Sequence, residues 1–285
     1  MPDERQTKNE KRDAAREQAR LTREKQKRQE RVRRWAIPTG VTVVVLAIVA
    51  IVVLVVTTSA PPPQSADGPK NMISDGILFT GSGGKMVATT TGAVQASSSP
   101  TPHDQPSDGV AHIVTYVDFS CPACKAFEAT NADAIQQLVE QGKATLEVHP
   151  IAILDHNFTT NYSTRSNNVA ACVANFAPDS FYPVMESMYV GQGQERTAGL
   201  TNAQMVNIVH TAGLKNGDVD KCINGVTFKS WVASATTRAT TGPLPNTSVA
   251  NVSFTPTVLV NGQQYGGDVT DAGAFTDFIQ QVLAG

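Results

Sequence analysis

The longest hydrophobic run of the chain lies near its N-terminal end. Residues 37–57 are almost wholly apolar, and about twenty residues at roughly 1.5 Å per residue cross a hydrocarbon core of about 30 Å. A cleaved signal peptide is the alternative, but its apolar region is usually about 7–15 residues long. The small residues 58–60 are also followed directly by three prolines, 61–63, which make a poor cleavage site. The pattern therefore predicts a retained transmembrane helix over residues 35–58.

Residues 59–108 are rich in Pro, Ser, Thr and Gly, a composition typical of linkers. One apolar island interrupts them. Gly76–Thr80 and Lys85–Thr89 flank the glycine-rich residues 81–84, which predicts a short two-stranded hairpin.

Residues 109–285 have the pattern of a folded α/β domain. The β-branched run His112–Asp118 predicts a buried strand. A helix is predicted from Cys121 to Gly142, where glycine favours a stop, and a second strand follows over Ala144–Ile151. Further predicted elements are helices over Val169–Phe176, Phe181–Val190, Asn202–Leu214 and Phe228–Thr237, a hairpin over Thr257–Tyr265 that turns at Asn261-Gly262, and a last helix over Asp271–Leu283. The four middle helices form a helical insert at about residues 155–250.

Charge is divided unevenly along the chain, although the formal net charge is only −2. Residues 1–34 hold 13 Lys and Arg against 7 Asp and Glu, which leaves 10 against 18 for the remainder. The first segment has almost no large apolar side chains, so we expect a solvated tail with its basic residues near anionic lipid. A basic excess before a span favours the cytoplasmic side. The sequence therefore predicts a single-pass membrane protein whose domain is extracytoplasmic, and no nucleic-acid partner is expected.

Four cysteines, Cys121, Cys124, Cys172 and Cys222, all follow the predicted span, in a compartment where disulfides persist. Four cysteines allow three pairings, and the spacing favours 121–124 together with 172–222. We expect the second pair to be a structural disulfide, with a second redox centre as the alternative. A zinc site usually presents its ligands as two close pairs, which this chain lacks. The five histidines show no ligand spacing, so neither a metal nor another cofactor is predicted.

A Cys-x-x-Cys pair between a strand and the first turn of a helix favours thiolate formation. The leading sulfur meets unpaired backbone N–H groups and the positive end of the helix dipole, which lowers its pKa from about 8.5 toward 7 or below. We predict that Cys121 is the nucleophile, because the first cysteine of the motif meets the helix N-terminus. Pro122 suits the first helical positions. Cys124, one turn further on, would resolve a mixed disulfide. The alternative is an inert structural bridge.

The sequence resembles the DsbA family in several segments at once. These are the first strand, the motif Phe119-Ser120-Cys121-Pro122-Ala123-Cys124, the helical insert, and Phe254-Thr255-Pro256-Thr257 before the last hairpin. The resemblance covers residues 109–285 and is nearest to the membrane-anchored DsbA-like proteins of actinobacteria. It implies a thioredoxin-like fold with a helical insert. It also implies that Pro256 is cis beside the active disulfide and that the main chain of Thr255 receives an extended substrate; a trans proline that opens a strand is the alternative.

Asp118 lies three residues before Cys121. Its carboxyl group could relay the proton of the buried cysteine during exchange, or it could be the solvated end of a strand. The DsbA of enteric bacteria differs at two nearby places: this chain has Thr115 where that strand carries a buried acid, and Ala123 where that motif has histidine. The second difference removes one neighbour that stabilises the thiolate.

These patterns predict an extracytoplasmic thiol:disulfide oxidoreductase that donates a disulfide to exported, unfolded or reduced proteins. The resemblance implies reoxidation by a membrane partner, a vitamin K epoxide reductase homologue. Two alternatives stay open. The enzyme could work in the opposite direction as a reductase or isomerase, or the Cys121–Cys124 pair could merely lock a thioredoxin-like binding module.

Overall fold

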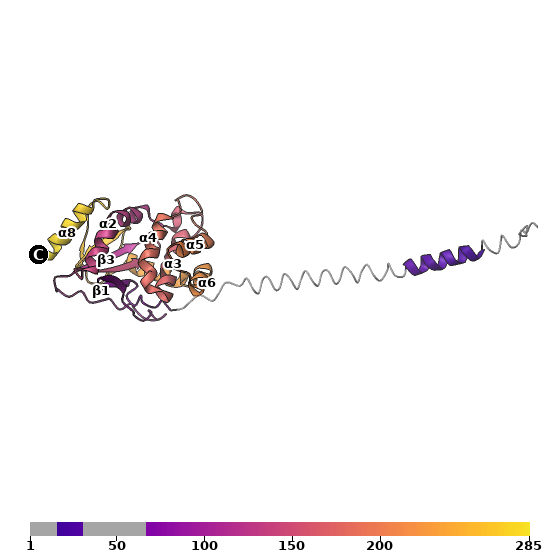
Figure 1. The fold of residues 1–285 in the computed structure, drawn as a ribbon, viewed down its shortest axis with the longest axis horizontal. Helices are drawn as coiled ribbons and strands as arrows, with labels where there is room; N and C mark the ends of the chain where they lie inside the picture. The colour runs from indigo at the N-terminus through magenta and orange to yellow at the C-terminus, as the bar shows by residue number, and fades with distance from the viewer. Residues whose placement is uncertain (1–15, 31–66) are drawn as a thin grey trace, which may run out of the picture. The chain divides into compact units, whose positions relative to one another are not determined.

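A computed structural model of the chain describes residues 16–30 and 67–285. It divides the chain into two compact units, residues 1–61 and residues 62–285. In the first unit, residues 16–30 form a helix whose side chains are all exposed (Figure 1). The membrane span predicted over residues 35–58 lies outside the described residues. Within the described ranges, no helix is long and apolar enough to cross a membrane.

The second unit is a mixed α/β domain built on one six-stranded sheet. Its elements are β1 (Ile77–Ser82), β2 (Lys85–Ala88), β3 (Ala111–Val117), α2 (Pro122–Glu140), β4 (Ala144–Pro150), α3 (Tyr162–Phe176), α4 (Phe181–Val190), α5 (Asn202–Thr211), α6 (Gly217–Gly225), α7 (Lys229–Thr241), β5 (Thr257–Val260), β6 (Gln263–Gln264) and α8 (Ala272–Ala284), with short 3-10 turns at Asp155–Asn157 and Pro178–Ser180. Strand order is β2-β1-β4-β3-β5-β6. The central strands β3 and β4 are parallel, and every other pairing is antiparallel.

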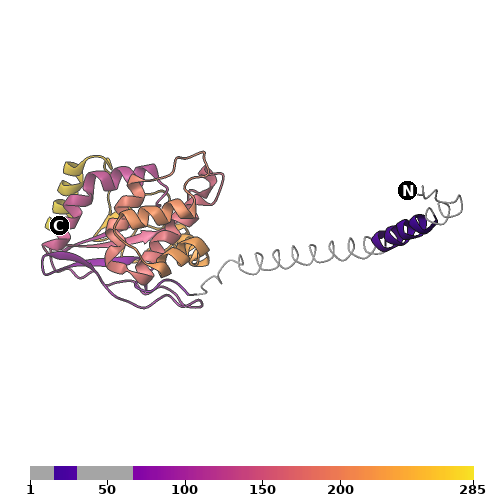
Figure 2. The same cartoon turned by 45° about the vertical axis from the view of Figure 1, so that its right-hand side comes forward.

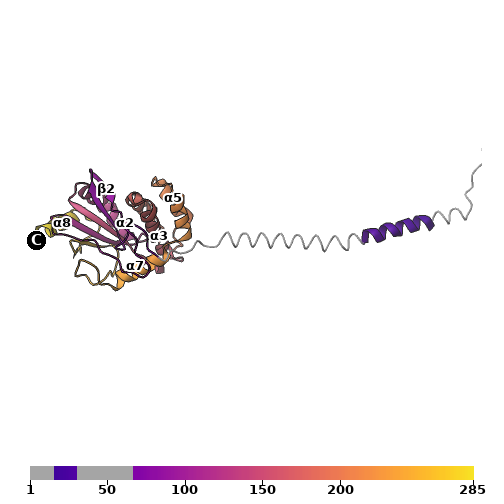
Figure 3. The same cartoon turned by 90° about the horizontal axis from the view of Figure 1, so that it is seen from below.

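Strand β3 is buried along its whole length because both faces of the sheet are covered. Ile113 and Val117 point into the larger core, which they share with residues of α2 and α8. Val114 and Tyr116 point to the opposite face, where they pack with Ala239 of α7. Helices α2 and α8 lie side by side in Figure 2, and the insert helices α3 and α5 gather at one end of the sheet in Figure 3.

The turns follow from residues that tolerate positive φ. Gly142, with φ of 68°, lies in the short turn that connects the end of α2 to the start of β4. Asn261 and Gly262 have φ of 46° and 77° and join β5 to β6, as expected for a two-residue hairpin. The predicted hairpin and the two central strands are therefore present.

The insert contains the four predicted helices and one more. Helix α3 starts seven residues earlier than predicted, and α6, between Gly217 and Gly225, was not anticipated. Two terminal glycines weaken its intrinsic helix propensity, but Asn216 caps it by accepting hydrogen bonds from the Asp218 and Val219 N–H groups. The predicted Cys172–Cys222 disulfide is present and joins α3 to α6.

The structure corrects the extent of the expected linker. The hairpin predicted within residues 59–108 exists as β1 and β2, but β1 pairs with β4 and extends the central sheet. Neighbouring residues are also tied to the insert, since Asn71 donates a hydrogen bond to the Ala174 carbonyl at 2.8 Å. Asp75 forms an ion pair with Arg238 of α7. Residues 67–108 thus belong to the folded domain. Their composition wrongly predicted a linker, because the pairing of β1 with β4 is long-range and composition does not reveal it.

Candidate active site

The Cys-x-x-Cys pair lies at the start of α2, just after the turn that connects β3 to this helix. Cys121 is the N-cap residue of α2, and Pro122 occupies the first turn, where the missing proline N–H costs nothing. The Cys121 N–H donates to the Asp118 carbonyl at 2.9 Å, which fixes the turn between strand and helix. Cys121 is 6% exposed, whereas Cys124 is fully buried, and both are free thiols. Both residues are therefore buried, and Cys121 is the less deeply buried of the two.

The environment separates the pKa values of the two thiols. The pKa of Cys121 is lowered to about 6. A hydrogen bond from Cys124 lowers it most, burial opposes this, and hydrogen bonds from the Thr255 side chain and from the N–H groups of Cys124 and Ala123 also contribute. Burial raises the pKa of Cys124 well above its ordinary value, and the neighbouring Cys121 raises it again. Near neutral pH, the Cys121 sulfur is thus mainly a thiolate and the Cys124 sulfur a thiol.

Thr255, the residue before Pro256, lies against the Cys121 sulfur. The Thr255–Pro256 peptide bond is cis, as the resemblance implied. The Cys121 thiol donates to the Thr255 carbonyl at 3.3 Å. The antiparallel register of β3 and β5, which sets Tyr116 opposite Thr257, brings these segments together.

Asp118 is fully buried, so the interpretation of a solvated strand end is wrong. One carboxylate oxygen accepts hydrogen bonds from the Ser120 N–H and hydroxyl and from the Asn167 amide. The other accepts from the Ser163 hydroxyl and from two backbone N–H groups, those of residues 153 and 154. Burial raises the pKa of Asp118, and these donors oppose the rise. The proposed proton relay stays a prediction.

Glu128 is a buried acid that the sequence analysis missed. It lies on α2 four residues after Cys124, and its Oε2 atom has no hydrogen-bond partner among the described residues. Burial, followed by the charge of Glu186, raises its pKa to about 8. The neighbouring Tyr189 is also buried, and its hydroxyl is likewise without a partner in the described part of the chain. An acidic residue at helical spacing from Cys124 on an apolar face was the available signal.

Gln192, just beyond the end of α4, was also missed. Its side-chain amide donates to the Phe119 and Cys121 carbonyl oxygens, both at 3.0 Å. These bonds hold the Cys-x-x-Cys turn from the side of the insert, so the insert contributes directly to the site. No sequence signal pointed to this contact, because 71 residues separate the donor from Cys121.

Histidines and acids do not form a metal centre in the part of the chain that the structure describes, where no group of three or more His, Cys, Asp or Glu could hold an ion. His103 and His149 instead contact the buried carboxylate of Glu147, at 3.0 and 3.2 Å. This cluster involves neither Cys121 nor Cys124.

Comparisons with known proteins identify the family and the fold of the domain. A family model described as Thioredoxin matches residues 107–281. The fold is similar to that of oxidised DsbA from Mycobacterium tuberculosis, with 23% identity, 73% of this chain and 93% of that chain covered, and a TM-score of 0.50. It is also similar to oxidised BdbD from Bacillus subtilis, with 17% identity, 78% and 100% covered, and a TM-score of 0.53. No curated protein sequence matches the chain. The expected thioredoxin-like fold with a helical insert is confirmed.

Proposed function

The chain belongs to the thioredoxin family, and from this premise we propose that it is a thiol:disulfide oxidoreductase that donates the Cys121–Cys124 disulfide to exported proteins. The observation that carries the proposal is the asymmetry of the two thiols. The pKa of Cys121 is lowered to about 6, whereas that of the fully buried Cys124 is raised well above its ordinary value. A stabilised Cys121 thiolate favours the reduced pair and so makes the disulfide form a better oxidant.

The oxidation proceeds by two exchanges. A client thiolate attacks the Cys121 sulfur of the oxidised pair; a mixed disulfide forms, the Cys121–Cys124 bond breaks, and the Cys124 sulfur leaves and takes up a proton. A second client thiolate then attacks the client sulfur of the mixed disulfide and releases the Cys121 thiolate. Two electrons pass from the client to the pair. The low pKa of Cys121 favours the second step, because a more acidic thiol is the better leaving group.

A protein client suits the surroundings of Cys121. Phe254 is 55% exposed and directly precedes Thr255, while Val190 is 81% exposed and its carbonyl accepts a hydrogen bond from Lys125, the residue after Cys124. Two exposed apolar side chains next to a reactive sulfur match an unfolded client that still exposes its own apolar residues. The Thr255 main chain offers backbone groups for an added strand.

The proposal includes the extracytoplasmic placement. The apolar run over residues 35–58 and the basic residues before it support a single-pass anchor with a cytoplasmic N-terminus. An anchored oxidant needs a membrane partner that takes up its electrons, and by resemblance this is a vitamin K epoxide reductase homologue. Protease added to intact spheroplasts should digest the domain; protection would reverse the topology.

The reduction potential of the pair tests the direction of exchange. We expect a value between those of thioredoxin, about −270 mV, and of the enteric DsbA, about −120 mV, because Ala123 replaces a thiolate-stabilising histidine. Equilibration with glutathione, followed by mass spectrometry, measures it. A potential at or below that of thioredoxin would favour the reductase or isomerase. A pair that does not react with glutathione would favour the non-catalytic binding module.

A further inference from the structure

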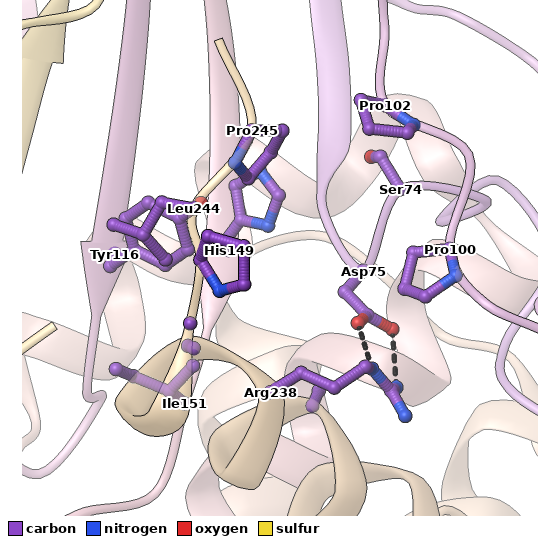
Figure 4. Close-up of a pocket in the computed structure, with 14 residues that line it drawn as sticks. Ser74, Asp75, Pro100, Pro102, Tyr116, His149, Ile151, Arg238, Leu244 and Pro245 are labelled. Atoms are coloured by element: carbon purple, nitrogen blue, oxygen red, sulfur yellow. Dashed lines mark hydrogen bonds and ion pairs between the residues drawn. The ribbon is translucent and has the colours of Figure 1, made fainter. Parts of the chain in front are cut away.

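A cavity of about 340 Å³ lies beside β3, β4 and α7, and neither Cys121 nor Cys124 lines it. Tyr116 and Leu244 are on one side, and Asp75, Pro100 and Pro102 are on the other (Figure 4). The volume is within the range of small-molecule sites, about 300–1,000 Å³, and such sites combine apolar walls with a few placed polar groups. The thiol chemistry makes no use of this cavity.

The walls of the cavity are held in place by packing. The rings of Tyr116 and His149 stack with their centroids 4.6 Å apart. Gly76 leaves the space for His149, because a Cβ atom there would lie 2.6 Å from the imidazole Nε2. On the opposite side, Arg238 donates to Asp75 at 2.6 and 2.8 Å. The cavity is therefore largely preformed.

Charges around the cavity are already balanced within the protein. Asp75 is paired with Arg238. Burial raises the pKa of Glu147, but His149, His103 and Ser74 together hold it well below its ordinary value. The hydrogen bond to Glu147 in turn raises the pKa of His103. Since each acid already has a basic partner, an ionic ligand would gain little to offset its desolvation.

Two polar atoms of the lining, the Tyr116 hydroxyl and His149 Nδ1, have no partner in the described part of the chain, and neither atom is fully enclosed by protein. The residue Tyr116 is only 3% exposed, and its hydroxyl makes no hydrogen bond there. His149 is 4% exposed and contacts Glu147 through Nε2, which leaves Nδ1 without a partner. Burial raises the pKa of Tyr116, so its hydroxyl keeps its proton and remains a donor. Unpaired polar atoms on the lining of an apolar cavity are the kind of group that fixes the orientation of a bound ligand.

We propose that this cavity binds a neutral, ring-bearing apolar molecule with a carbonyl group, whose oxygen accepts a hydrogen bond from the Tyr116 hydroxyl. The stacked Tyr116 and His149 rings provide a flat surface for the ligand ring, and Ile151 and Leu244 contribute apolar contacts. The site is separate from the thiol pair, so it stands whether or not the proposed redox function is correct.

Three probes of similar size test the chemistry: 4-phenyl-2-butanone, butylbenzene without an acceptor, and the anion 4-phenylbutyrate. Each is titrated into the full-length chain in lipid nanodiscs while the methyl NMR signals of Ile151 and Leu244 are followed. We expect the ketone to bind most tightly, by about 5-fold over butylbenzene, as one hydrogen bond of typical net strength would give. Equal affinity for butylbenzene, tighter binding of the anion, or no response to any probe would each overturn the proposal.

Two variants locate the ligand. Tyr116→Phe should weaken ketone binding about 5-fold and leave butylbenzene binding unchanged, because only the hydroxyl is removed. Leu244→Trp should fill the cavity and reduce binding of the ketone at least tenfold, with the response followed at Ile151. Thiol exchange at Cys121 should be unaffected in both variants, which shows that the fold is intact. Undiminished ketone binding in a folded Leu244→Trp protein would contradict the assignment.

Discussion

The thiol of Cys121 donates a hydrogen bond to the main-chain carbonyl of Thr255 at 3.3 Å, across 134 residues of sequence. The contact exists because β3 and β5 are antiparallel neighbours, with Tyr116 opposite Thr257. The reactive sulfur lies just after β3 and the backbone that would receive a client lies just before β5, so the pairing of these two strands places them together. This arrangement keeps both parts of the site in register.

The exposure difference predicts which cysteine forms the bond to the client. Cys124→Ser should accumulate mixed disulfides between Cys121 and exported proteins, because the Cys121 thiolate can still attack a client disulfide, expelling one client sulfur as a thiolate, and no Cys124 thiol remains to displace the bound client. Cys121→Ser should trap none, since Cys124 is fully buried. Non-reducing electrophoresis of protein from growing cells measures both. More adduct with Cys121→Ser than with Cys124→Ser would refute the assignment of roles.

The low pKa of Cys121 predicts how its reactivity depends on pH. Because the thiolate is the reactive form and its pKa is about 6, alkylation by iodoacetamide should rise with pH and reach half its plateau rate near pH 6. Cys124→Ala removes the hydrogen bond that lowers the pKa most, so its midpoint should move to higher pH. A wild-type midpoint near the ordinary thiol value, with the variant unchanged, would contradict the stabilised thiolate.

The raised pKa of Glu128, about 8 against an ordinary 4.5, predicts a stability effect. The folded state holds this proton more tightly than the unfolded state, so its stabilising effect is present below about pH 4.5 and is lost as pH rises through 8. The unfolding free energy of Glu128→Gln relative to wild type should therefore be greater at pH 8 than at pH 5. We expect this difference to increase by at least about 2 kcal/mol between the two pH values. Urea denaturation at both pH values measures this difference.

Glu186→Gln is the matched control for Glu128. It removes a neighbouring carboxylate whose side chain is only partly buried, so its pH-dependent gain should be smaller. Equal gains from the two variants would show that general surface charge, rather than burial of Glu128, sets the pH dependence.

The hydrogen bonds to Asp118 predict a large structural effect of its removal. Asp118→Ala leaves donors on Ser120, Ser163 and Asn167 and two backbone N–H groups without their acceptor. Because a buried donor without a partner costs about 1–3 kcal/mol, we expect a loss of at least about 3 kcal/mol in denaturant unfolding. Ser163→Ala, which removes a single donor, should cost clearly less. A proton relay would further require that Asp118→Asn slow the exchange step of Cys124 in a pH-dependent manner.

The disulfide between Cys172 and Cys222 predicts stability without a part in exchange. It joins α3 to α6 across a sequence separation of 50 residues, and closing such a loop stabilises by up to about 4 kcal/mol in the chain-entropy model. Replacing both cysteines with alanine should lower the melting temperature in calorimetry while exchange at Cys121 continues. Loss of exchange in a variant that still folds would instead indicate an electron relay.

Local chemistry explains why much of the domain was predictable. The β-branched run of β3, the Asn261-Gly262 turn and the position of Cys121 at the start of a helix are set by neighbours within a few residues. Helix α6 was not predicted because it begins and ends with glycine, which has low helix propensity. The hydrogen bonds by which Asn216 caps it were identified only from the structure.

Residues 67–108 were misjudged for a different reason. Proline, serine and glycine are as common in surface loops of a domain as in linkers, and the edge pairing of β1 with β4 connects positions about seventy residues apart. Amino-acid composition reflects local conformational preferences and does not indicate which distant strand a segment pairs with.

The sequence by itself determined most of the strand–helix order and the position of the Cys-x-x-Cys pair, because periodicity, turn residues and motif spacing are local properties. The position of Thr255 and Pro256 beside that pair was implied by the family resemblance. Only the tertiary structure decided that Asp118 and Glu128 are buried, that Gln192 holds the Cys-x-x-Cys turn, and that Tyr116 and His149 line a cavity with unpaired polar groups. Burial and hydrogen-bond satisfaction depend on segments that meet after folding, and these set the pKa values and binding properties of the individual side chains.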